Sequence, residues 1–164
     1  MRAVLTLLCV LTLVLIFSNS LQSGEKSSGQ SSAVTDAVQD VAGVIAPDSG
    51  VANATGTEYD KLHMDIRTLA HFGEFALLGA LLIFCYFSYT RTKSFLILPL
   101  SGIVLTPLVD ECLQMFATAR AAELKDVLVD TAGGVFGVVL AVLALVIGGW
   151  LYRRRRAKKQ LKNG

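Results

Sequence analysis

Ionisable and polar side chains lie inside or beside apolar stretches of this chain, in three clusters. Charged groups cost roughly 2.5–3.5 kcal/mol at the centre of a membrane-spanning helix, so they usually face a cavity or a partner. Spacings of three or four residues recur within the clusters and place their members on one face of a helix. The clusters are Arg67, His71 and Glu74; Asp110, Glu111 and Gln114; and Asp126 with Asp130, with Arg120 and Lys125 between the last two.

These side-chain types support two kinds of chemistry. An imidazole beside carboxylates can act as a general base, with another carboxylate as the general acid. Arginine and lysine can instead bind a phosphate group, while carboxylates accept hydrogen bonds from hydroxyls and amines. The candidate acid–base residues are His71, Glu74, Asp110 and Glu111. The candidate ligand-binding residues are Arg67, His71, Glu74, Asp110, Glu111, Gln114, Arg120, Asp126 and Asp130.

Four apolar stretches are long enough to hold these residues in a membrane. About 20 mostly apolar residues cross the hydrocarbon layer, and the 164-residue chain is 53% hydrophobic. We therefore predict an all-α integral membrane four-helix bundle with a polar pocket near its outer face. The first stretch begins like a signal peptide, but its length favours an uncleaved anchor. The predicted spans are Ala3–Ser20, Leu69–Tyr89, Ser94–Gln114 and Val127–Leu151.

Basic residues predict the orientation of the spans, because short cytoplasmic segments are rich in lysine and arginine. Residues 153–164 form a basic tail, so both termini are predicted to be cytoplasmic. Residues 21–66 are then an extracytoplasmic loop, and the polar clusters lie in the outer turns of the other spans. We accordingly divide the chain into a first span at 1–20, this loop, a three-span core at 67–152, and the tail.

Two further patterns predict how segments pack. The stretch Val34–Ile45 carries apolar residues at helical spacing, which predicts a short amphipathic helix in the outer loop. Such a helix would lie on the membrane surface or over the spans. Gly133 and Gly137 are four residues apart in the last span, and this small-residue face predicts a close approach by another helix.

Several other functions lack support in the sequence. The three cysteines lie in apolar stretches, without the paired spacing of a disulfide framework or a metal site. One histidine among carboxylates is thin evidence for a divalent ion, so we predict neither a metal nor a cofactor. The basic tail lacks interleaved aromatic residues, which argues against nucleic acid as a partner. Polar groups confined to one leaflet argue against a proton-coupled carrier.

Four segments carry motifs in a fixed order. Arg67–Gly79 begins Arg-Thr-Leu-Ala-His-Phe-Gly-Glu, and Asp110–Phe116 reads Asp-Glu-Cys-Leu-Gln-Met-Phe. Asp126–Gly137 follows Arg120, and Phe17–Ser27 surrounds the end of the first span. Together they resemble the VanZ-like family, over nearly the whole chain apart from the basic tail.

The resemblance implies a bacterial cytoplasmic-membrane protein. The family's namesake is linked to glycopeptide resistance, specifically to teicoplanin. Two positions depart from the family pattern. Phe75 stands where tyrosine is common, so a hydroxyl role is absent there, and Ala119 precedes Arg120 where Pro-Gly is frequent.

Two functional hypotheses follow. The first is a non-enzymatic cell-envelope protein whose pocket binds a membrane lipid, a lipid-linked cell-wall precursor or a lipoglycopeptide, and which contributes to teicoplanin-type resistance. The second is a membrane-embedded enzyme acting on an outer-leaflet lipid, with His71 and carboxylates as acid and base. We favour the first, because the sequence has no nucleophile elbow or phosphate loop. Any one of these residues can be purely structural, but three spans placing polar groups at one depth favour a site. The oligomeric state does not follow from the sequence.

Overall fold

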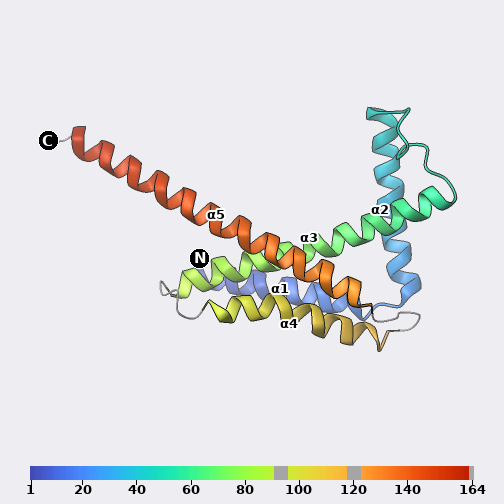
Figure 1. The fold of residues 1–164 in the computed structure, drawn as a ribbon, viewed down its shortest axis with the longest axis horizontal. Coiled ribbons are helices and arrows are strands. Elements are labelled where there is room, and N and C mark those ends of the chain that lie inside the picture. The colour runs from blue at the N-terminus through green and yellow to red at the C-terminus, as the bar shows by residue number, and fades with distance from the viewer. Residues whose placement is uncertain (91–95, 118–122, 163–164) are drawn as a thin grey trace.

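The computed structural model describes residues 1–90, 96–117 and 123–162, and these residues form five helices and no strands. Four of the helices pack into a bundle, and α2 stands across one end of it beside α3 (Figure 1). The all-α prediction is therefore confirmed. The helices are α1 (Arg2–Ser20), α2 (Gly24–Ile45), α3 (Thr57–Tyr89), α4 (Ile97–Gln114) and α5 (Leu124–Lys162).

The four bundle helices, α1, α3, α4 and α5, are each long and apolar enough to cross a membrane. α1, α3 and α5 contain three of the predicted spans, and α4 covers the remaining one from Ile97 to Gln114; residues 94 and 95 of that prediction lie outside the described residues. Many of their large apolar side chains point outward, including Leu7, Leu105 and Leu140. Hydrocarbon can cover these side chains, whereas a water-soluble bundle of this size would have to bury them. The chain is therefore a multi-pass membrane protein.

The helices α3 and α5 make the most extensive contact in the bundle, and they approach each other over glycines. A Cβ atom on Gly133 would overlap the backbone of Phe72, and one on Gly137 would overlap the backbone of Ala76. The predicted close approach at these glycines is confirmed. These two backbone contacts fix how α3 and the first turns of α5 are aligned along each other.

The N-terminus and the polar clusters lie at opposite ends of the bundle. At the N-terminal end, Thr6 Oγ1 and the Tyr89 hydroxyl are 3.0 Å apart, and the Arg2 guanidinium lies 5.6 Å from the centre of the Tyr89 ring. The start of α1 is therefore beside the end of α3, and α5 runs past this end towards the C-terminus (Figure 1). That both termini face the cytoplasm stays a prediction.

Helix α2 is longer than the predicted amphipathic helix, because it begins at Gly24. The valines and isoleucine of Val34–Ile45 remain exposed, so they are not the residues that hold α2 to the bundle. Polar pairs with the first turns of α3 do so instead. These pairs are Tyr59 Oη with Asp36 Oδ1 at 2.7 Å, and His63 Nε2 with Ser31 Oγ at 2.8 Å.

Two bundle helices continue beyond the apolar runs that predicted them. α3 begins at Thr57 instead of Leu69, and α5 extends through the basic tail to Lys162. Hydropathy detects only the part of a helix that is apolar, while the backbone hydrogen bonds of a helix continue equally well through polar residues. The start of α3 thereby reaches α2 and positions Arg67.

Candidate functional site

Three helices bring their polar clusters together at the end of the bundle opposite the N-terminus. The three residues of the α3 cluster follow one another at intervals of about one turn on a single face of the helix. The α4 cluster lies in the last two turns of that helix. The first turns of α5 complete the group. Four of these side chains are almost fully enclosed by protein, unlike residues at an exposed helix end. They are Asp110 (0% exposed), Glu111 (7%), Gln114 (2%) and Asp130 (1%).

The end of α1 contributes two polar residues that the sequence analysis did not select. Asn19 Nδ2 donates a hydrogen bond to Glu74 Oε1 at 3.0 Å. The Ser20 hydroxyl, fully buried, donates to Asp110 Oδ1 at 2.5 Å. Only the adjacency of the first span to α3 and α4 reveals these roles. The available signals were the change from apolar to polar residues at the end of the first span and the place of both residues in the Phe17–Ser27 segment of the family resemblance.

The carboxylates of α4 are fixed from more than one side. Gln114 Nε2 donates to Asp110 Oδ2 at 3.1 Å, so both oxygens of Asp110 accept hydrogen bonds. Oε1 of Glu111 accepts a hydrogen bond from the backbone N–H of Glu123, just before α5 begins. The other oxygen of Glu111, Oε2, is buried without a hydrogen-bond partner among the described residues.

The most compact grouping consists of His71, Asp110 and Asp130, one from each of α3, α4 and α5. A nitrogen of the His71 ring and one oxygen from each carboxylate lie within 4.8 Å of one another. Asp130 Oδ1 is buried and has no hydrogen-bond partner among the described residues. The interhelical register set by Gly133 and Gly137 brings Asp130 into this position.

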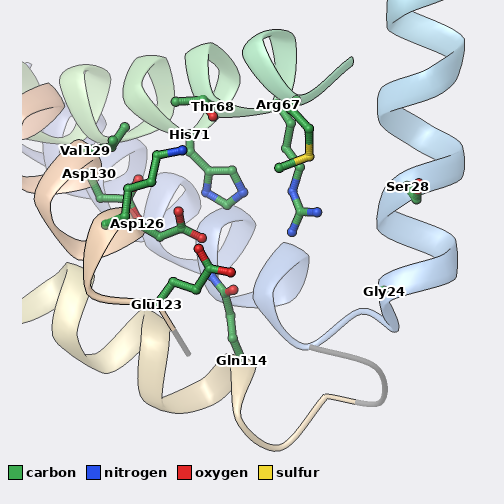
Figure 2. A pocket seen from close by; sticks show the side chains of 12 residues that line it. Gly24, Ser28, Arg67, Thr68, His71, Gln114, Glu123, Asp126, Val129 and Asp130 are labelled. Carbon is green, nitrogen blue, oxygen red and sulfur yellow. The ribbon is translucent and has the colours of Figure 1, made fainter. Parts of the chain in front are cut away.

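A cavity of about 360 Å³ opens beside this grouping. Figure 2 shows the His71 ring between Arg67 and the acidic side chains at the start of α5. Arg67 and His71 also line an adjoining cavity of about 160 Å³, which Glu74 and residues of α2 complete. The polar residues lining the larger cavity are Ser28, Arg67, Thr68, His71, Gln114, Glu123, Lys125, Asp126 and Asp130.

Eight of the nine predicted ligand-binding residues can be placed, and they occupy three kinds of position. Five line the larger cavity, as Arg67, His71, Gln114, Asp126 and Asp130 do. Glu74 lines the smaller cavity. Asp110 and Glu111 line neither cavity; they are buried in α4 and hydrogen-bonded there. The ninth, Arg120, lies outside the described residues.

Besides Asn19 and Ser20, the sequence analysis missed Ser28 and Glu123, whose place at the cavity depends on how α2 and α5 enter the bundle.

A comparison with known protein families identifies the family to which the chain is related. The family model VanZ/LLP1 matches residues 4–146, which include every residue placed at the two cavities. The chain belongs to the VanZ/LLP1 family. No curated protein and no solved structure matches it.

The larger cavity of this VanZ/LLP1 protein combines both signs of charge. Arg67 and Lys125 are the basic residues that line it, and Glu123, Asp126 and Asp130 are the acidic ones. Basic side chains can bind a phosphate through charge-assisted hydrogen bonds, and carboxylates can accept hydrogen bonds from hydroxyl or amine groups. The arrangement therefore suits a ligand that carries a phosphate together with such donors.

Proposed function

We propose that this VanZ/LLP1 protein binds the headgroup of a membrane lipid or of a lipid-linked cell-wall precursor. The observation that carries the proposal is the presence of Arg67 and Lys125 in one cavity with three carboxylates. A phosphate would lie between the guanidinium and the ammonium group. The carboxylates of α5 would bind the hydroxyl or amine groups of the same headgroup.

The size of the cavity supports a headgroup as the bound part. Small-molecule sites commonly measure about 300–1,000 Å³, and 360 Å³ is near the lower limit of that range. The acyl or prenyl chains would remain in the bilayer, against the apolar side chains on the outside of the bundle, such as Leu69 on α3 and Leu128 on α5. The protein thus holds the polar end of a lipid without enclosing all of it.

The orientation of the spans supports the outer leaflet of the bacterial cytoplasmic membrane as the place of binding. The basic tail after α5 favours a cytoplasmic C-terminus, and the cavity lies at the opposite end of the bundle from the N-terminus. A cavity at the outer surface meets lipid-linked precursors after they have crossed the membrane, and it also meets antibiotics that act there.

Teicoplanin-type resistance is the physiological effect that we propose for this binding. The link of the family's namesake to teicoplanin supports it, and so does the chemistry of a lipoglycopeptide, which offers amine and hydroxyl groups on a lipid anchor. A susceptible host that expresses the wild-type protein should need more teicoplanin for growth inhibition than one expressing Asp130→Ala at equal membrane abundance. Equal susceptibility of the two strains would reject the resistance role.

The binding itself is tested by titration with lipids that differ in one group. Native mass spectrometry of the purified protein should find tighter binding of a short-chain phosphatidic acid than of the diacylglycerol with the same chains. Arg67→Gln should weaken the binding of phosphatidic acid about tenfold, since a hydrogen bond to a charged group contributes roughly 1.5–3 kcal/mol. Arg155→Gln, in the tail, is the matched control and should bind like the wild type. Equal affinities for both lipids would contradict the proposal.

A membrane-embedded enzyme is the second candidate, favoured by the grouping of His71 with Asp110 and Asp130. A histidine beside carboxylates can act as a general base towards a bound lipid. The same titration separates the two functions when it is followed over time. An enzyme would convert the lipid into a product of different mass, whereas a binding protein would leave it unchanged.

A further inference from the structure

We propose that His71, Asp110 and Asp130 bind one divalent transition-metal ion at the inner wall of the cavity. The three side chains belong to α3, α4 and α5, so the ion would join three of the four bundle helices. His71 and Asp130 also line the cavity. An ion held by these three residues would keep a coordination position directed towards the cavity, as metals with three protein ligands commonly do.

The distances between the donor atoms fit a shared ion after small movements. The His71 nitrogen and the two carboxylate oxygens lie within 4.8 Å of one another. Tetrahedral ligands at about 2.0–2.2 Å from one Zn²⁺ ion are roughly 3.3–3.6 Å apart. Side-chain rotations that move the donor atoms by about an ångström would bring them into that range.

The carboxylate of Asp130 supplies an independent observation that indicates a ligand. Its side chain is 1% exposed, and Oδ1 has no hydrogen-bond partner among the described residues. Burial of a carboxylate oxygen without a partner is costly, and buried charges in proteins are normally paired or coordinate a metal. A cation bound with His71 and Asp110 would satisfy this oxygen.

The surroundings of Asp110 are those of a metal ligand. Ser20 donates a hydrogen bond to Oδ1, and Gln114 donates one to Oδ2. These two hydrogen bonds orient the carboxylate beside His71 and Asp130. Outer partners of this kind are characteristic of carboxylates that coordinate metals.

The donor set indicates which ions to test. An imidazole nitrogen suits zinc and other first-row transition metals, and carboxylates also suit manganese. Calcium and magnesium prefer oxygen ligands alone, so the imidazole favours a transition metal. The sequence analysis predicted no metal site because the sequence gives one histidine among carboxylates, without the interhelical packing that brings Asp110 and Asp130 beside it.

The metal site shares His71 and Asp130 with the cavity proposed to bind a headgroup, so it is tested with metal alone, in the absence of lipid ligands. The full-length protein, carrying an affinity tag without histidines, would be stripped with a chelator in detergent and titrated with Zn²⁺ against a competing indicator. We expect one saturable site per chain. Ser20→Ala should weaken it by about 10-fold or more, the usual effect of removing an outer partner, and Asp130→Asn should weaken it at least as much.

The matched control is Asp65→Asn, which removes an exposed carboxylate of α3 outside the grouping and should bind like the wild type. Asp130→Cys provides a variant that keeps a ligand, and its thiolate should shift the preference from Zn²⁺ towards the softer Cd²⁺. Absence of saturable Zn²⁺ binding by the wild type would overturn the proposal. So would unchanged affinity in a folded Asp130→Asn protein, or an equal loss in Asp65→Asn.

Discussion

Replacement of Gly137 by alanine should push α3 and α5 apart and destabilise the bundle. The new Cβ atom would overlap the carbonyl group of Ala76, and this group belongs to the backbone of α3 and cannot rotate away. Overpacking of this kind costs about 1–3 kcal/mol. The better helix propensity of alanine offsets at most about 1 kcal/mol of that cost. The overlapped atoms are backbone atoms, so the upper part of that range applies, and we expect a net loss of about 1–2 kcal/mol in the free energy of unfolding.

The matched control is Gly148→Ala, which makes the same substitution on the same helix. Among the described residues, no atom of another helix lies within 4 Å of the Cβ position at Gly148, so this variant should unfold at the same temperature as the wild type or slightly higher. Circular dichroism during heating, in one detergent, compares the two melting temperatures. Equal melting temperatures would refute the view that backbone contact at Gly137 holds α3 and α5 together.

Two further predictions concern orientation and the unity of the site. Reporter domains inserted at Gly29 and Glu123 should read external, and one fused after Lys162 should read cytoplasmic; a cytoplasmic reading at Gly29 would contradict the predicted orientation. His71→Ala and Glu111→Ala should each abolish the phenotype that the protein confers while membrane abundance, measured by immunoblot, is retained. The double variant should be little worse than either single one, because groups that act as a unit are strongly non-additive; losses that follow abundance alone would indicate a purely structural role.

The spans and the polar faces of single helices were predictable because they depend on local patterns. Apolar runs of membrane-spanning length mark α1, α3, α4 and α5 in the sequence. Helical spacing alone places Arg67, His71 and Glu74 on one face. Both signals lie within a few turns of the chain, so no knowledge of neighbouring helices is needed to read them.

The parts that escaped prediction depend on contacts between distant segments. Ser20 becomes part of the site only because α1 ends beside Asp110 of α4. The serine-rich first half of α2 has little apolar periodicity, and one of the contacts that hold it to α3 joins Ser31 to His63. Such pairings are set by the packing of the whole bundle, which composition and spacing do not encode locally.

The identity of the lipid that co-purifies with the protein tests the central claim most directly. Wild-type protein and Arg67→Gln would be extracted from the same host under mild conditions, and their bound lipids would be compared by mass spectrometry after normalisation to protein. We predict a phosphate-bearing lipid or lipid-linked precursor enriched on the wild type and depleted about tenfold on Arg67→Gln. Identical lipid profiles, equal to that of the bulk membrane, would contradict the proposal that this cavity binds a headgroup.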